Sequence, residues 1–188
     1  MNYEVIAIGA SWGGLLAVGT LLEGIPQELD QAIVVAQHRS RESARGVLAS
    51  LLQRHIGRPV SEPADKEPIE PQHVYIAPAD YHLLVDGGHF SLSVDARVQF
   101  ARPSIDVLFQ SVAETYRDRA IGVVLTGANE DGAAGLAAIK RNGGVSIVQD
   151  PQSAERRQMP DAAIAGSVAD AVLPLEAIPP FLYGLCCP

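Results

Sequence analysis

The sequence has few cysteines, and it has no long apolar run. Its two cysteines, Cys186 and Cys187, are adjacent, so they cannot link distant parts of a fold by a disulfide, and we assign them no role. No apolar stretch approaches the roughly 20 residues that a helix needs to cross a bilayer. The N-terminus, MNYEVIAIGAS, has no basic segment typical of a signal peptide. We therefore expect a cytoplasmic protein with no membrane insertion.

Positive charge is also scarce. The chain has 14 Lys and Arg against 22 Asp and Glu, which gives a net charge of -8 over 188 residues. Binding to phosphate backbones or to anionic lipid needs an excess of basic surface, so this balance argues against nucleic acid or a membrane as the main partner. The length suits one domain, and we expect a single domain over residues 1–188.

Short apolar runs typical of buried parallel strands alternate with helix-like segments. Strands are expected at 5–8, 32–36, 73–77, 121–126 and 144–149. Helices are expected at 15–22, 41–55, 103–116, 133–142, 162–166 and 175–185, with a surface loop at 150–160. Residues 83–85 and 89–94 flank Asp86-Gly87-Gly88, which predicts an antiparallel hairpin. The fold class expected is α/β, a three-layer, doubly wound, mainly parallel sheet with an inserted antiparallel β-hairpin.

A glycine-rich turn follows the first expected strand. Ser11 lies where this strand, which ends before Gly9, turns into a helix N-terminus. Unpaired backbone N–H groups and the positive end of the helix dipole meet at such a position and stabilise negative charge. Gly9 to Gly13 also fits the pattern G-x-S-x-G, in which the glycines permit a sharp turn that exposes a serine hydroxyl.

Three other interpretations of this turn are open. It fits a tight turn that needs glycine and nothing more. It also fits a dinucleotide-binding loop, although Ser11 takes the place of the second glycine of G-x-G-x-x-G, where a side chain would crowd a pyrophosphate. A phosphate or nucleotide site at Gly9 to Gly14 is the third, but no lysine follows as in a P-loop.

Two further polar residues follow expected core strands. His38 comes after the strand at 32–36, and Asp131 comes after the strand at 121–126. Carboxyl ends of parallel strands share one sheet edge, so both side chains are expected near Ser11. A serine needs a neighbouring base and a histidine needs a partner that fixes its tautomer, so these three residues are sufficient for nucleophilic catalysis. Backbone N–H groups of Trp12, Gly13 and Gly14 are expected to stabilise an oxyanion.

These polar residues have structural interpretations too. Asp131 is equally suited to cap the helix that begins after it. His38 is equally suited to be a histidine at the end of a strand with no further role. His82 and His89 are expected on the surface of the hairpin. No third ligand stands at a recognisable spacing from them, so we assign no metal site.

The whole chain resembles the catalytic domain of the CheB family, the protein-glutamate methylesterases of bacterial chemotaxis. The matching segments are VIAIGASWGG, VVAQH, VYIAP followed by HL, RPSIDVLF, LTGANEDGAAG and QMPDAAI. The resemblance implies a catalytic triad of Ser11, His38 and Asp131. It implies hydrolysis of glutamate γ-methyl esters on the cytoplasmic helical region of methyl-accepting chemotaxis receptors, and also deamidation of receptor glutamines. This reaction needs no metal and no cofactor.

Three residues, in two of the motifs, depart from the pattern usual in this family. Trp12 follows the serine where threonine is usual, and Ala128 with Asn129 replaces methionine and glycine. An indole beside Ser11 is expected to reshape the approach to the hydroxyl. A catalytically weak regulatory or binding module of the same fold is therefore the alternative function. No segment resembles the receiver domain of many relatives. Either the protein acts without phosphorylation in cis, with a separate regulatory protein as one source of control, or the sequence is a fragment of a longer protein.

Overall fold

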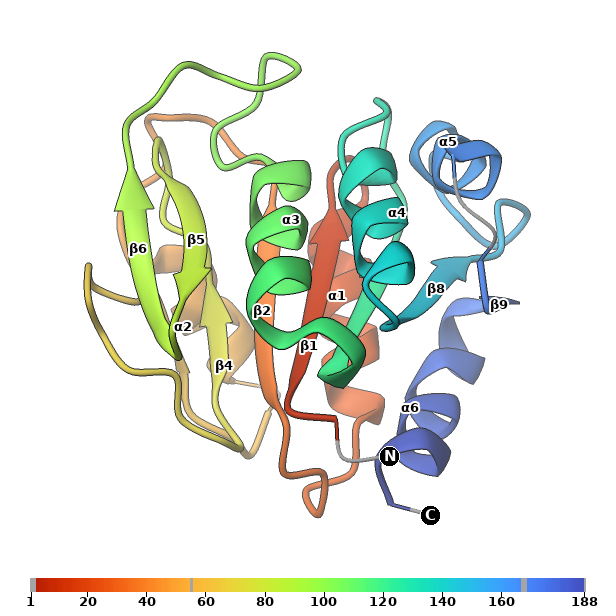
Figure 1. The fold of residues 1–188 in the computed structure, drawn as a ribbon. Helices are drawn as coiled ribbons and strands as arrows, with labels where there is room; N and C mark the ends of the chain where they lie inside the picture. Colours follow the sequence, from red (N-terminus) through yellow and green to blue (C-terminus); the bar gives the residue numbers. More distant parts are fainter. Residues whose placement is uncertain (1–2, 55, 167–168, 188) are drawn as a thin grey trace.

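The computed structural model describes residues 3–54, 56–166 and 169–187, in which strands and helices alternate (Figure 1). The strands are β1 Val5–Ala10, β2 Ala32–Gln37, β3 Val60–Ser61, β4 Val74–Ile76, β5 His82–Asp86, β6 His89–Ser93, β7 Ala120–Val124, β8 Val145–Gln149 and β9 Ala171–Leu173. The helices are α1 Gly14–Gly24, α2 Val47–Gln53, α3 Ile105–Tyr116, α4 Ala133–Arg141, α5 Gln158–Gly166 and α6 Ile178–Cys186. Within these residues no helix has the length and apolar character of a membrane span.

The described strands form one parallel sheet and one separate hairpin. The sheet has the order β3-β4-β2-β1-β7-β8-β9, and every neighbouring pair in it is parallel. Strands β5 and β6 form a separate antiparallel pair, with Asp86 opposite His89, and His89 also forms an isolated bridge with Pro68. The strand order runs outward in both directions from β1, as in a doubly wound fold.

Helices cover both faces of the sheet because side chains along a strand alternate between its faces. In β1, Ile6 and Ile8 pack with α1, α2 and α6, whereas Val5 and Ala7 pack with α3, α4 and α5 on the opposite face (Figure 1). All six residues of β1 are buried, which explains why the strand is apolar at nearly every position. The expected three-layer fold with an inserted hairpin is confirmed.

The hairpin packs beside α3. Leu83, Val85 and Phe90 join the same buried cluster as the apolar face of α3, and the Ser111 hydroxyl accepts a hydrogen bond from the Val85 N–H at 3.0 Å. The chain from β6 to α3 then crosses the end of the sheet at which β1 ends (Figure 1). The hairpin therefore places residues 94–104 near the expected site.

Several element boundaries differ from the sequence prediction. The helix expected at 41–55 forms only over α2, because Gly46 adopts a left-handed φ of 75° and the residues before it form turns; His55 lies outside the described residues. Strands β3 and β9 were not predicted, since edge strands of 2 and 3 residues carry little pattern. Helix α5 begins at Gln158, inside the loop expected at 150–160.

Candidate functional site

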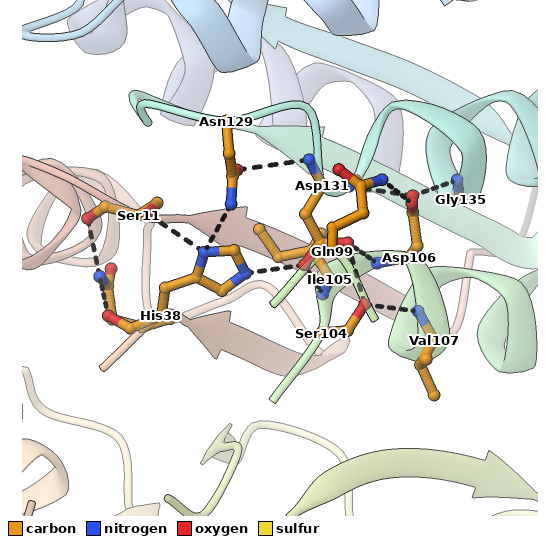
Figure 2. Close-up of polar contacts among 12 residues, drawn as sticks. Ser11, His38, Gln99, Ser104, Ile105, Asp106, Val107, Asn129, Asp131 and Gly135 are labelled. Atoms are coloured by element: carbon orange, nitrogen blue, oxygen red, sulfur yellow. Dashed lines mark hydrogen bonds and ion pairs between the residues drawn. The ribbon is translucent and has the colours of Figure 1, made fainter. Parts of the chain in front are cut away.

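The parallel register brings Ser11 and His38 together. Ala10 at the end of β1 lies opposite Gln37 at the end of β2, so the residues that follow both strands are neighbours. The His38 N–H donates to the Ala10 carbonyl at 3.0 Å, which extends this register by one residue. Asp131 reaches the same edge from the turn between β7 and α4 (Figure 2).

A continuous hydrogen-bonded chain links the three side chains. His38 Nδ1 lies 3.1 Å from Ser11 Oγ, and His38 Nε2 lies 2.7 Å from Asp131 Oδ2 (Figure 2). An ionised carboxylate only accepts hydrogen bonds, so we assign the imidazole proton to Nε2. The lone pair on Nδ1 then faces the Ser11 hydroxyl. This arrangement places a general base beside a serine.

Asn129 also contacts the imidazole. Its Nδ2 group lies 3.3 Å from His38 Nδ1, and its Oδ1 accepts from the Asp131 N–H at 3.3 Å (Figure 2). The second bond fixes the orientation of the amide, so the Asn129 NH₂ group faces the ring nitrogen. The sequence analysis noted Asn129 only as a departure from a family pattern. Its contact with the ring could not be read from spacing.

Asp131 is fully buried at the N-terminus of α3. Oδ1 accepts from the Ser104 hydroxyl at 2.9 Å and the Asp106 N–H at 2.9 Å, and Oδ2 accepts from the Ile105 N–H at 2.7 Å. The alternative in which Asp131 caps its own helix is therefore wrong: it caps α3, and a different carboxylate serves α4. Unpaired helix N–H groups hold the Asp131 carboxylate in place.

Asp106 of α3 caps α4 in return. Its Oδ1 accepts from the Gly132 N–H at 2.9 Å and the Gly135 N–H at 2.7 Å, and its Oδ2 accepts from the Gln99 amide at 3.1 Å. Gly132 has a φ of 100°, a conformation that favours glycine. The two helices thus exchange carboxylates at their N-termini, which ties the Asp131 turn rigidly to α3.

The two buried carboxylates have opposite pKa shifts. Burial raises the pKa of Asp106, and the nearby charge of Asp131 adds to this against the opposing backbone hydrogen bonds. Burial also acts to raise the pKa of Asp131, but hydrogen bonds from His38 and from the Asp106 and Ile105 N–H groups outweigh it and lower the pKa below its usual value. Asp131 therefore stays ionised as the acceptor for His38.

His82 is buried, which corrects the expectation of a surface residue. It is 2% exposed; its Nε2 donates to the Ala96 carbonyl at 3.0 Å and its Nδ1 accepts from the Ser104 N–H at 3.2 Å. The Ser104 hydroxyl in turn donates to Asp131, so His82 helps to position Ser104 against the Asp131 carboxylate. No three His, Cys, Asp or Glu residues in the described ranges are grouped so as to hold a metal ion.

The turn after Ser11 offers free backbone donors. The Gly14 N–H donates to the Ser11 carbonyl at 2.9 Å, so it does not serve the oxyanion role expected for it. Among the described residues, nothing accepts a hydrogen bond from the Trp12 or Gly13 N–H. Gln37 stabilises the turn, because its amide donates to the Ser11 carbonyl at 2.8 Å and to the His38 carbonyl at 3.0 Å.

Trp12 turns toward the loop after β8. Its indole Nε1 donates to Glu155 at 2.9 Å, and the Arg156 guanidinium lies 5.4 Å from the ring centroid. The indole is 58% exposed, and Ala128 is also exposed on the turn after β7. The Glu155 side chain occupies the space that a Cβ on residue 13 would need, so only glycine fits beside it.

Two hollows flank the serine and histidine. A cavity of about 610 Å³ lies on the side of α1 and α2 and includes Ser11, Leu16 and Leu51 in its lining. A second cavity of about 310 Å³ lies on the other side, between His38 and the segment that precedes α3. Ser11 itself lines the first cavity, whereas His38 and Asn129 line the second.

Comparison with known proteins gives consistent matches over nearly the whole chain. The family model described as CheB methylesterase matches residues 6–182. A protein of Leptospira interrogans is 47% identical over 95% of this chain and 92% of its own length. A protein-glutamate methylesterase/protein-glutamine glutaminase 2 of Vibrio vulnificus is 40% identical, and the match covers 98% of this chain but 54% of that relative.

A solved structure agrees with these matches. The Thermotoga maritima CheB methylesterase catalytic domain superposes with a TM-score of 0.91 at 32% identity, covering 98% of this chain and 100% of that one. The sequence relatives and the shared fold lead to one assignment. The chain belongs to the CheB methylesterase family.

Proposed function

We propose that this protein hydrolyses γ-methyl esters of glutamate side chains on chemoreceptors, and deamidates receptor glutamines, through Ser11, His38 and Asp131. The observation that carries the proposal is the hydrogen-bonded chain from Ser11 Oγ through both ring nitrogens of His38 to Asp131. A serine hydroxyl is a weak nucleophile near neutral pH, and this chain supplies the base that activates it. The names of relatives supply the substrate class.

In the proposed reaction, Ser11 Oγ attacks the ester carbonyl while His38 Nδ1 takes the hydroxyl proton. Asp131 accepts the Nε2 hydrogen bond and stabilises the imidazolium. The C–O bond to the methoxy group then breaks, and the proton on Nδ1 passes to methanol. Water, deprotonated by His38, hydrolyses the acyl-serine and leaves the glutamate carboxylate. Each proton taken by the imidazole is returned within the cycle.

The free N–H groups of Trp12 and Gly13 are the proposed oxyanion donors. They lie at the N-terminus of α1, where the helix dipole also favours negative charge. One such donor contributes roughly 3 to 4 kcal/mol of transition-state stabilisation in enzymes where it has been removed. Gly13 suits this position because its φ of 74° is a conformation that other residues adopt at a cost.

The test is methanol release from methyl-esterified chemoreceptor membranes. Ser11→Ala should lower kcat by about 10⁶-fold, to background, because it removes the hydroxyl that lies 3.1 Å from His38 Nδ1. Ser50→Ala is the matched control, since Ser50 is an exposed serine of α2 and should leave the rate unchanged. Equal release by wild type and Ser11→Ala would reject the mechanism.

The alternative function, a catalytically weak regulatory or binding module, can be tested by substituting Trp12 and Ala128. The variant W12T/A128M introduces the residues usual in the family, and we expect its kcat/KM to stay within about threefold of wild type, because both positions are exposed. We also expect a loss of about 1 kcal/mol in the free energy of unfolding, from the lost contacts of the indole with Glu155 and Arg156. Methanol release and urea unfolding measure both. A large gain in activity would instead favour the alternative.

A further inference from the structure

We propose that the turn Arg97–Arg102 and the cavity beside His38 form the docking site for an acidic, amphipathic helix of the protein substrate. The inference rests on the proposed function and specifies how the substrate is held. The turn supplies an apolar anchor, Phe100, and the cavity supplies guanidinium groups. Together they would seat a helix that carries the esterified glutamate with apolar and acidic residues beside it.

Phe100 is the most exposed large apolar residue of the described chain, at 94%. It lies at the tip of a tight turn closed by two backbone hydrogen bonds between Val98 and Ala101, at 3.1 and 2.9 Å. Gln99 and Phe100 both have positive φ, 47° and 64°, which is unfavourable for side chains of this size. An unfavourable turn that displays an aromatic ring in water points to a role in binding.

The exposure of Phe100 does not come from a loose loop. The Gln99 amide is bonded to Asp106, and thus to the buried carboxylates that hold the site. Arg102 donates to Asp80 at 2.8 Å and to the carbonyls of Val94 and Asp95 at 2.6 and 2.9 Å. The turn that carries the ring is therefore fixed beside His38, and a fixed backbone reduces the conformational entropy lost on binding.

Three arginines, Arg39, Arg97 and Arg102, line the cavity under this turn, together with His38 and Asn129. No carboxylate is among the described residues that line it, although Glu62 pairs with Arg39, and Asp80 pairs with Arg102 at 2.8 Å and with Arg97 at 3.4 Å. This concentration of arginine contrasts with the net charge of -8 of the whole chain. A ligand that carries carboxylates is the one that such a lining favours.

Arg39 has hydrogen-bonding capacity to spare. Its side chain is 8% exposed; Nη2 donates to Glu62 at 2.6 Å and to the Ala77 carbonyl at 2.9 Å. Within the described part of the chain, no acceptor faces its Nε or Nη1 groups, both of which are buried. Buried donors without acceptors are rare, and an acidic side chain entering the cavity would supply one.

The cavity on the other side of Ser11 is the competing surface. Its lining has three exposed apolar residues, Leu15, Leu16 and Leu51, of which Leu16 is 75% exposed. Arg54 also lines it, but so does the carboxylate of Glu23. A helix rich in carboxylates meets less positive charge there. The two surfaces therefore make different predictions, and on each of them an exposed apolar residue and an arginine can be substituted.

The experiment compares kcat/KM for a methyl-esterified receptor cytoplasmic fragment with kcat/KM for a small ester, N-acetylglutamate γ-methyl ester. Phe100→Ala should lower the ratio of kcat/KM for the receptor fragment to kcat/KM for the small ester about 10-fold, because KM for the receptor fragment rises. Arg97→Gln should lower it about threefold and weaken its dependence on ionic strength. Leu16→Ala and Arg54→Gln are the matched controls and should leave the ratio unchanged.

The outcomes separate the two proposals. A wild-type protein that releases no methanol from the receptor would overturn the proposed function and this inference with it. Normal wild-type release with unchanged ratios for Phe100→Ala and Arg97→Gln would overturn the inference alone. Ratios that fall only for Leu16→Ala and Arg54→Gln would also overturn it, and would place the helix on α1 and α2.

Discussion

Asp131→Asn is expected to lower kcat/KM for the receptor ester by about 10⁴-fold, the loss seen when the orienting carboxylate of a serine protease is made an amide. The carboxylate of Asp131 accepts the Nε2 hydrogen bond of His38 at 2.7 Å and so keeps the lone pair of Nδ1 toward Ser11. An amide NH₂ at the same place would favour the tautomer that is protonated on Nδ1. His38 could then no longer take the serine proton.

The surroundings of Asp131 leave an asparagine no satisfactory orientation. One oxygen accepts from His38 and the Ile105 N–H, and the other accepts from the Ser104 hydroxyl and the Asp106 N–H. The Ser104 hydroxyl and the imidazole can each become acceptors, but the two backbone N–H groups cannot. Either orientation therefore sets an NH₂ group against a backbone donor, at a cost of about 1 to 3 kcal/mol in stability.

Both effects can be measured on one preparation. Methanol release gives kcat/KM, and urea unfolding gives the free energy of unfolding. Asp86→Asn is the matched control, because Asp86 is an exposed carboxylate of the hairpin and should change neither quantity appreciably. Activity of Asp131→Asn within tenfold of wild type would show that Asp131 does not orient His38.

The sequence was sufficient to predict the meeting of Ser11 and His38. Both follow runs of buried strand residues, and parallel strands that end together bring the next residues together. The paired ends of β1 and β2 are the physical basis for that prediction. The turn around Gly132 could be placed for the same reason, since the strand before it is apolar and a glycine opens the helix after it.

The supporting contacts could not be predicted because they depend on packing between elements distant in sequence. Asp106 lies on the amphipathic helix expected at 103–116, and nothing in the local sequence shows that its side chain reaches the start of α4. His82 looked like a hairpin surface residue because strand alternation does not reveal that residues 96–104 fold over it. Burial of polar groups is set by which elements cover them, which a single sequence leaves open.

Asp106→Ala should cause the largest loss of stability, about 3 kcal/mol in the free energy of unfolding, because three donors lose a buried acceptor. The Gly132 and Gly135 N–H groups at the start of α4 would be left unpaired, as would the Gln99 amide. Asp106→Asn is the matched control. It keeps an oxygen for the glycine N–H groups, and the Gln99 amide can turn over to accept from its NH₂ group, so a loss below about 1 kcal/mol is expected.

The pH dependence of the free energy of unfolding, compared between wild type and Asp106→Asn, gives a second, independent readout. Because burial raises the pKa of Asp106, the folded protein holds this proton to higher pH than the unfolded chain. Its ionisation therefore opposes folding: the stability that Asp106 contributes is full below the usual aspartate pKa of about 3.9 and falls as pH rises through the raised value. The Asp106→Asn variant has no carboxyl group at this position, so it does not lose stability in this way as pH rises.

The stability of Asp106→Asn relative to wild type should thus increase as pH rises above the usual aspartate range. Asp131 has the opposite dependence, because its lowered pKa adds stability above the usual value that is lost as pH falls through the lowered one. Asp131 is present in both proteins, so the difference between their urea unfolding curves reports the titration of Asp106 together with its coupling to Asp131. A difference that stays constant with pH, or equal losses for Ala and Asn, would show that the Asp106 carboxylate does not hold α4 to α3 as its contacts indicate.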